Sequence, residues 1–202
     1  MLFMSDINQI IVGSILGDGS LSPLTKRNKC STLDISQHES KLPYLRWLYD
    51  QLAKKFELNP IYQKKGFENQ YRFRSKPNKI LGIFRSKFYD SLNGRKIIPR
   101  DIGDLLKNPI SLAVWYMDDG TLDKRYKYHL NSSIATNCFS FEECNLLSEV
   151  LNNNFKLKTS VNKTTMRGKI YPRIYFKSEC MSDFIKIIKP YIHSVFNYKI
   201  GI

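Results

Sequence analysis

The feature that most constrains this chain is a nine-residue pattern that occurs twice, at residues 11–19 (IVGSILGDG) and at residues 112–120 (LAVWYMDDG). Each copy is an apolar run that stops at an aspartate followed by a glycine. The pattern predicts the last two turns of a helix, ended by a glycine that is free to adopt a left-handed conformation. In the first copy Gly13 and Gly17 lie four apart on one helix face, which would let another helix approach closely.

The two aspartates stand at the unfavourable end of their predicted helices. A carboxylate near a helix C-terminus faces the negative end of the macrodipole, at a cost of about 0.3–1 kcal/mol. The second copy places two acids there, Asp118 and Asp119, which also repel each other. Violations of local rules concentrate at functional sites. A divalent cation takes oxygen ligands, so it would ease such a carboxylate pair if the two helix ends met.

The spacing of the two copies indicates an internal duplication. Asp18 and Asp119 lie 101 positions apart, which is half of a chain of 202 residues. Residues 52–58 also align with residues 151–157, at an offset of 99. The predicted halves are residues 1–107 and residues 108–202.

Hydrophobic periodicity predicts the same order of elements in both halves. Pro43 and Pro109 each open a helix, and Ser140 with Glu143 forms a capping box before another. The expected helices cover residues 5–18, 43–56, 78–90, 109–119, 140–154 and 182–188, and the expected strands cover residues 31–37, 60–65, 70–75, 131–137, 158–163 and 170–177. Each half is therefore predicted as αβαββα, and a further strand after each motif stays open. This order is typical of an α/β protein of the α+β type.

Alternation within two of the strands separates an apolar face from a basic one. In residues 70–75 the rings of Tyr71 and Phe73 share a face opposite Arg72 and Arg74. Residues 170–177 repeat the pattern. A polar face of an antiparallel sheet is often only a solvated face. We favour contact with DNA because both halves carry the pattern.

The charge of the chain supports a polyanionic partner. The sequence contains 32 Lys and Arg residues against 18 Asp and Glu residues, a formal net charge of +14. Such a charge fits nucleic acid or an anionic membrane surface, although a generally basic surface is the alternative. No secretory signal and no run of about 20 apolar residues is present, so we expect no membrane span. Four cysteines without metal-binding spacing favour a reducing, intracellular compartment. Mitochondrion and chloroplast both stay open.

The two motifs resemble the signature of the LAGLIDADG homing endonucleases in their single-chain, two-copy form. Residues 11–19 and 112–120 match the nine-letter pattern end to end, and the catalytic acids fall on Asp18 and Asp119. Asp118 departs from the pattern, which has a small residue at that place. The resemblance covers nearly the whole chain. It implies two pseudo-symmetric halves whose antiparallel sheets form a saddle over DNA, with the two motif helices packed at the central interface.

The resemblance also implies the chemistry. Asp18 and Asp119 would hold Mg²⁺, for which Mn²⁺ can substitute, and carboxylate-held Mg²⁺ can activate water and neutralise the phosphate. Lys96 and Lys199 are similar to the paired basic residues that some members hold near the scissile phosphates. They align at an offset of 103 and would orient water or stabilise developing charge. For each lysine, an ordinary surface position is the alternative.

The predicted DNA-binding residues lie on the strands and in the basic loops after the motifs. Arginine suits guanine edges and phosphates because its planar fork donates two hydrogen bonds at once. The candidates are Lys26, Arg27, Lys64, Arg72, Arg74, Lys124, Arg125, Lys158, Lys163, Arg173, Tyr175 and Lys177.

The leading functional prediction is a monomeric, Mg²⁺-dependent, site-specific double-strand DNA endonuclease. It would recognise a long asymmetric target of about two helical turns, leave short 3′ overhangs and promote the mobility of its intron or gene. The chain starts with Met and shows no protein-splicing blocks, so we expect a free-standing or intron-encoded enzyme. Two alternatives stay open. One is a maturase that binds intron RNA and assists its splicing, and the other is a non-cleaving DNA-binding protein on the same fold.

Overall fold

The computed structural model describes residues 5–126 and 129–202, with the backbone alone for residues 124–126 and 129. The first half contains α1 (Asp6–Leu16), β1 (Ser20–Leu21), β2 (Leu33–His38), η1 (Glu39–Lys41), α2 (Leu42–Ala53), β3 (Tyr62–Gln63), β4 (Gln70–Arg74) and α3 (Lys79–Phe88). A short helix, α4 (Ile102–Leu105), precedes the second motif. The second half contains α5 (Pro109–Asp119), β5 (Gly120–Tyr126), β6 (His129–Ala135), α6 (Phe141–Phe155), β7 (Thr159–Met166), β8 (Lys169–Phe176), η2 (Ser178–Cys180), α7 (Met181–Ile188), η3 (Lys189–Tyr191) and η4 (Ser194–Lys199).

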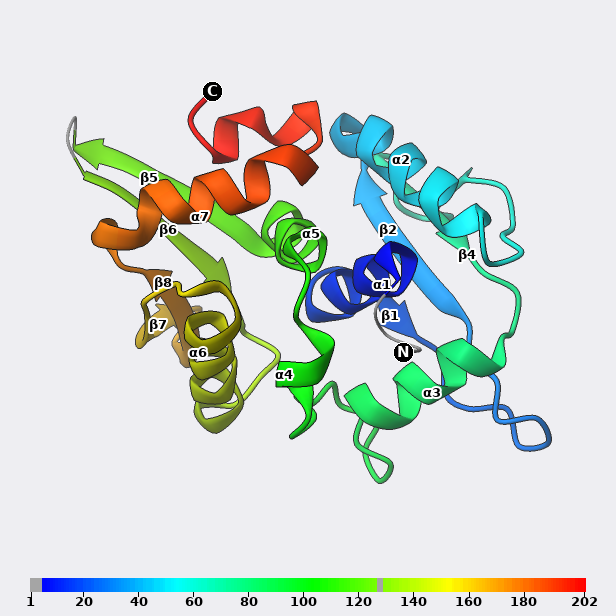
Figure 1. Ribbon diagram of the computed structural model, residues 1–202. Helices are drawn as coiled ribbons and strands as arrows, with labels where there is room; N and C mark the ends of the chain where they lie inside the picture. Colours follow the sequence, from blue (N-terminus) through cyan, green and yellow to red (C-terminus); the bar gives the residue numbers. More distant parts are fainter. Residues whose placement is uncertain (1–4, 127–128) are drawn as a thin grey trace.

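Two antiparallel sheets with the same topology form the frame of the molecule. Their strand orders are β1-β2-β4-β3 and β5-β6-β8-β7. Strands β1 and β5 follow the motif helices directly, so the further strand that the sequence left open is present in both halves. Each half therefore has the order αββαββα, and the predicted α+β fold with two pseudo-symmetric halves is confirmed (Figure 1).

The motif helices α1 and α5 lie side by side at the centre of the molecule, between the two sheets (Figure 1). Their close approach depends on glycine, as the sequence predicted. A Cβ atom on Gly13 would lie 2.5 Å from the backbone oxygen of Ser111, and one on Gly17 would lie 2.6 Å from Oδ2 of Asp118. Side chains larger than hydrogen would therefore push the helices apart.

Capping residues fix where the helices begin. The Ser5 hydroxyl accepts a hydrogen bond from the amide of Asn8 at the start of α1. Asn108 caps α5, whose first residue is Pro109. The predicted capping box of Ser140 and Glu143 is present at the start of α6. These bonds satisfy amides that have no partner inside the helix.

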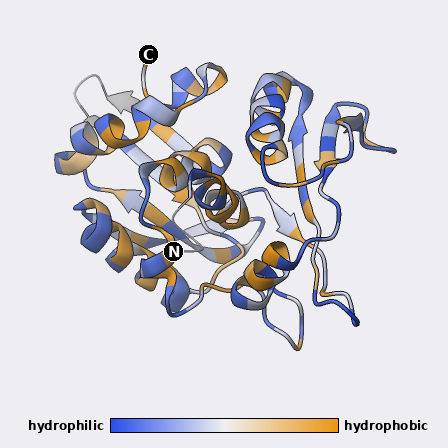
Figure 2. Cartoon of the chain, turned by 45° about the vertical axis from the view of Figure 1, so that its right-hand side comes forward, coloured by the Kyte–Doolittle hydropathy of each residue, from blue (hydrophilic) through white to orange (hydrophobic). Residues whose placement is uncertain are grey.

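The predicted strand faces are also present. Phe73 and Ile174 are fully buried, whereas Arg74 and Lys177 are exposed. Helix α2 contacts β2 and β4, while α6 and α7 cover the same side of the second sheet. Figure 2 shows hydrophobic segments concentrated on the central helices, and both hydrophobic and hydrophilic segments along the strands. Within residues 5–126 and 129–202, no helix combines the length and apolar character that a membrane span requires.

One local prediction was wrong, because the glycines after the motif aspartates are not left-handed. Gly120 has φ −75° and ψ 149° and starts β5, and Gly19 also lacks a positive φ. Space explains their presence instead. A Cβ atom on Gly120 would lie 2.4 Å from the backbone oxygen of Tyr116, and one on Gly19 would lie 2.8 Å from that of Ser14. The chain therefore enters a strand at once after α5, and after the three residues 17–19 at the end of α1.

Candidate active site

The two motif aspartates lie at the adjoining C-terminal ends of α1 and α5. Asp18 follows α1 and is exposed, and Asp119 is the last residue of α5 and is partly buried. Burial, followed by the negative charge of Asp18, raises the pKa of Asp119 to about 7. Lys96, Lys199 and Lys41 oppose this rise. The fold therefore brings two carboxylates that are 101 positions apart in sequence into mutual electrostatic contact.

Asp118 lies between the two helices and ties the halves together. One of its carboxylate oxygens accepts hydrogen bonds from the Tyr44 hydroxyl at 3.1 Å and from Nε2 of Gln37 at 3.2 Å. The other oxygen accepts from the backbone amide of Asp18 at 3.2 Å. Burial, together with Asp18 and Asp119, raises the pKa of Asp118 well above its usual range. The residue that departs from the motif is thus a buried bridge between the halves, placed against Gly17.

Gln37 holds the first aspartate in place. Its Nε2 atom donates to Oδ2 of Asp18 at 2.9 Å as well as to Asp118. Gln37 was missed from the sequence, although it left a signal there. It follows Leu33 and Ile35 on the buried face of β2, where a third apolar side chain would be expected. A glutamine in that row is buried only because the aspartates accept its hydrogen bonds.

Lys96 reaches the end of the first motif helix. Its Nζ atom donates to the backbone oxygen of Gly17 at 2.8 Å, directly beside Asp18. Burial lowers the pKa of Lys96, and the charges of Asp119, Asp118 and Asp18 act against this. The link that carries Lys96 is held by the second half, since Glu143 accepts from the guanidinium of Arg95 and from the amide of Ile98.

Lys199 occupies the matching place in the second half. Its side chain is inside the protein, with the residue 7% exposed, and its Nζ atom donates to the backbone oxygen of Met117 at 2.7 Å. The hydroxyl of Tyr116 donates to the backbone oxygen of Lys199 at 2.9 Å and so anchors η4. Burial and the charge of Lys41 lower the pKa of Lys199 to about 8. Each motif helix therefore ends against one lysine, which is partly buried in the case of Lys96 and buried in the case of Lys199.

A cavity extends from the second aspartate toward the sheet. It has a volume of about 370 Å³ and is lined by Asp118, Asp119, Gly120, Thr121, Leu122, Ala135, Arg173, Tyr198 and Lys199. Arg173 also lines a neighbouring hollow of about 460 Å³ on β5, β6, β7 and β8, together with Tyr175 and Lys177. Asp18, Asp118 and Asp119 form an acidic centre, and this centre is thus continuous with the polar face of the second sheet.

Residues 8–184 match the model of the LAGLIDADG DNA endonuclease family. The chain belongs to this family. The resemblance predicted from its two motifs is therefore confirmed, and both copies of the LAGLIDADG motif lie within the matched region.

Similar proteins include both endonucleases and maturases. The solved structure of the homing endonuclease I-WcaI, bound to its DNA recognition sequence, superimposes with a TM-score of 0.77 over 98% of this chain and 87% of that one, at 25% identity. The cytochrome b mRNA maturase bI2 of Saccharomyces cerevisiae is 31% identical over 97% of this chain, which spans 47% of that relative's length. The maturase bI2 of Debaryomyces hansenii is 30% identical, over 96% of this chain and 72% of its own length.

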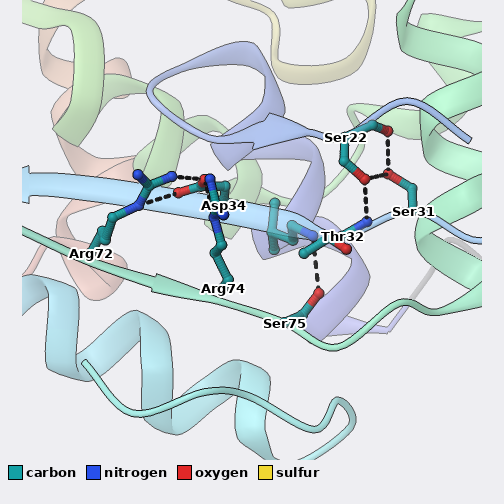
Figure 3. A network of polar contacts seen from close by, with 8 residues as sticks. Ser22, Ser31, Thr32, Asp34, Arg72, Arg74 and Ser75 are labelled. Atoms are coloured by element: carbon teal, nitrogen blue, oxygen red, sulfur yellow. Dashed lines mark hydrogen bonds and ion pairs between the residues drawn. The ribbon is translucent and has the colours of Figure 1, made fainter. Parts of the chain in front are cut away.

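The predicted DNA-binding residues divide into three groups. Arg72 and Arg74 share the carboxylate of Asp34 on the polar face of the first sheet (Figure 3). Five further candidates have a partner or line a hollow, and three are exposed. Lys64 lies over the ring of Phe67, Lys158 pairs with Glu179, Arg173, Tyr175 and Lys177 line the hollow, and Lys26, Arg27 and Lys163 are exposed. The side chains of Lys124 and Arg125 lie outside the described residues, and DNA contact by this LAGLIDADG chain stays a prediction for all twelve.

The acidic centre suits a cation that brings most of its ligands with it. In the described part of the chain, no group of three or more His, Cys, Asp or Glu side chains is arranged to hold a metal ion. Mg²⁺ often binds through one or two carboxylates and takes its other oxygens from water and substrate phosphates. Asp18 and Asp119 fit this requirement, since burial and the negative charge of Asp18 raise the pKa of Asp119, and a cation would favour its ionised form.

Proposed function

We propose that this chain is a site-specific endonuclease that hydrolyses both strands of double-stranded DNA with Mg²⁺ and leaves short 3′ overhangs. The observation that carries the proposal is the pairing at the centre of the molecule. Each motif aspartate stands at the end of its helix, and each helix end accepts a hydrogen bond from a lysine that is buried or partly buried. The family match and the DNA-bound relative of the same fold support duplex DNA as the substrate.

Each residue of the centre has a distinct part in the proposed reaction. Asp18 and Asp119 hold the divalent cation, which when bound supplies Lewis acidity and an activated water. Gln37 keeps the Asp18 carboxylate in one orientation. Lys96 and Lys199 direct ammonium groups toward the place where negative charge develops, and their lowered pKa values reflect a site with little water. The lysines orient the attacking water or stabilise the charge of the transition state.

Target recognition belongs to the polar faces of the two sheets. The halves, residues 1–107 and residues 108–202, each read one part of a long asymmetric target of about two helical turns. Because one chain carries both halves, it acts as a monomer. The physiological outcome is the mobility of the intron or gene that encodes it.

The test is cleavage of a randomised double-stranded DNA library with Mg²⁺ or Mn²⁺, with an EDTA control and sequencing of the ends. We expect discrete ends around one long motif that are absent with EDTA. Asp18→Asn and Asp119→Asn should abolish cleavage while DNA affinity persists. Loss of affinity in both variants would mean that the aspartates are structural and would overturn the proposed mechanism.

The second candidate function is that of a maturase that binds intron RNA. It is favoured by a specific observation, namely that two relatives at 30% and 31% identity are named cytochrome b mRNA maturases. Binding of a structured intron RNA with no DNA cleavage would support it. Both activities in one protein are separable, because the aspartate variants should lose DNA cleavage and keep RNA binding.

A further inference from the structure

We propose that Asp34 is a specificity-determining residue, which fixes the guanidinium groups of Arg72 and Arg74 so that the first half reads guanine more strictly than the second. The inference rests on the proposed DNA-binding function. Asp34 lies on β2, on the polar face of the first sheet, whose other face packs against α2.

One carboxylate holds both arginines. Nε of Arg72 donates to Oδ1 of Asp34 at 3.1 Å, and Nη2 of Arg72 pairs with Oδ2. Nε of Arg74 donates to the same Oδ2 atom at 2.7 Å. Figure 3 shows the two guanidinium groups converging on Asp34 from the neighbouring strand. The strand register explains this, since Asp34 pairs with Arg74, and Arg72 pairs with Ser36, two residues along β2.

The arrangement leaves each arginine with donors that point elsewhere. A guanidinium has five N–H groups. Asp34 takes Nε and Nη2 of Arg72 but only Nε of Arg74, so the Nη1 and Nη2 pair of Arg74 is not engaged by Asp34. This pair is the fork that matches O6 and N7 of guanine. The Arg74 side chain is 49% exposed, against 17% for Asp34, so the fork is more accessible than the carboxylate that holds it.

An acid at this place is a disadvantage for affinity. A carboxylate facing phosphates is repelled, and with two arginines it reduces the local charge from +2 to +1. Phosphate neutralisation supplies most of the non-specific affinity for DNA. A rigid arginine, in contrast, loses less conformational entropy when it binds a base edge. The gain from Asp34 is therefore in discrimination between sequences and not in overall affinity.

The second half provides an internal comparison. The paired residues Ile35 and Phe73 correspond to Ile134 and Ile174, because both pairs lie at the buried centre of the same strand pair. By this register, Ser133 takes the place of Asp34, Arg173 that of Arg72, and Tyr175 that of Arg74.

The corresponding arginine has a weaker partner. Nη1 of Arg173 donates to the hydroxyl of Ser133 at 3.0 Å. A single neutral hydrogen bond holds a guanidinium less firmly than a paired carboxylate does. The corresponding arginines, Arg72 and Arg173, are therefore held with different firmness. This difference is a basis for unequal selectivity at the two ends of the target.

The experiment replaces the hydrogen-bond acceptor of the first half, Asp34, with that of the second half. Asp34→Ser installs the residue of the second half, Asp34→Asn keeps the shape without the charge, and Asp50→Asn removes an exposed acid from α2 as a charge-matched control. Each full-length variant is bound to a randomised duplex library with Ca²⁺ in place of Mg²⁺, and the selected sequences are compared half by half. Affinity for a fixed non-target duplex is measured at several salt concentrations.

For Asp34→Ser we expect guanine preference at one or two positions of the first half-site to fall by about 5- to 100-fold. Affinity for the non-target duplex should rise, with a salt dependence steeper by up to about one phosphate contact. The second half-site should be unchanged, and Asp50→Asn should alter neither half-site. Asp34→Asn should fall between Asp34→Ser and the parent protein, and it carries the test if the serine variant fails to fold.

Two results would overturn the inference. The first is an unchanged profile in a folded Asp34 variant, and the second is an equal loss of selectivity in both half-sites. If the parent protein itself shows no sequence preference for duplex DNA, the proposed function fails instead. The library experiment thus separates the two failures.

Discussion

At the scale of single residues, the acidic centre depends on partners that the motif alone does not name. The sequence predicted Asp18, Asp119, Lys96 and Lys199 because each belongs to a repeated pattern. Gln37 has no such repeat. By the strand register its counterpart is Thr136, whose hydroxyl donates to the backbone oxygen of Pro172 at 2.8 Å. A residue that acts in one half only leaves no trace in a comparison of the two halves.

The raised pKa of Asp119 has a consequence for stability that can be measured. Its value is about 7 in the folded protein and close to 3.8 in the unfolded chain, so between these values the folded protein binds the extra proton. The free energy of unfolding should therefore decrease as pH rises from about 4 to about 7. Asp119→Asn should flatten this decrease, as measured by urea unfolding at a series of pH values without divalent cations.

The same proton competes with Mg²⁺. Because carboxylates bind metal in the ionised form, the rise in Tm caused by Mg²⁺ should be larger at pH 8 than at pH 6. The double substitution of Asp18 and Asp119 by asparagine should remove this rise at both pH values. A rise that persists in the double variant would place the cation elsewhere.

At the scale of elements, the contact between α1 and α5 does not tolerate larger side chains at its glycines. Gly13→Ala should destabilise the protein by about 1–3 kcal/mol, because its Cβ would meet backbone atoms that cannot move independently. Gly103→Ala in α4 is the matched control, since its Cβ would lie at an ordinary 3.6 Å from Val150. It should be neutral or slightly stabilising. Chemical denaturation of both variants measures the difference, and equal effects would contradict the close-contact explanation.

The connection between the halves is positioned by α6. Glu143→Gln should weaken the hydrogen bonds to Arg95 and Ile98, so that Lys96 is positioned less firmly. In the proposed endonuclease this should slow cleavage of one strand more than the other, so that nicked plasmid accumulates. Ser140→Ala removes the cap of the same helix and should cost about 1 kcal/mol without this strand bias. Equal slowing of both strands by Glu143→Gln would reduce its role to stability.

At the scale of the whole molecule, the net charge of +14 makes a prediction that does not depend on any single contact. If six to ten phosphates are neutralised, affinity for duplex DNA should fall by about 10³ to 10⁵ between 50 and 200 mM salt. Fluorescence anisotropy titrations at several salt concentrations measure this slope. A flat response would mean that the basic residues do not form a DNA-binding surface.

The sequence predicted the architecture well because the duplication is expressed in patterns that repeat. The apolar runs, the caps of the two motif helices and the alternation of Phe73 with Arg72 and Arg74 all recur at an offset near 100. The handedness of Gly19 and Gly120 was predicted wrongly, since the need for space against Tyr116 or Ser14 cannot be read from neighbours in sequence. The bridging role of Asp118 could not be predicted from the sequence for the same reason. Its partners Gln37 and Tyr44 come from distant elements.

The hydrogen bonds between Glu143 and residues 95–98 also limit where this protein could be recombined with a relative. Residues 95–98 precede the second motif and pair through their backbone with Phe88 and Asp90 of the first half. The Arg95 side chain and the Ile98 amide nevertheless bind Glu143 of α6, while the ammonium group of Lys96 binds the end of α1. Hybrids assembled from two family members would therefore inherit a lysine from one parent and its support from the other. In a functional chimera, residues 95–98 and residue 143 should therefore come from the same parent protein.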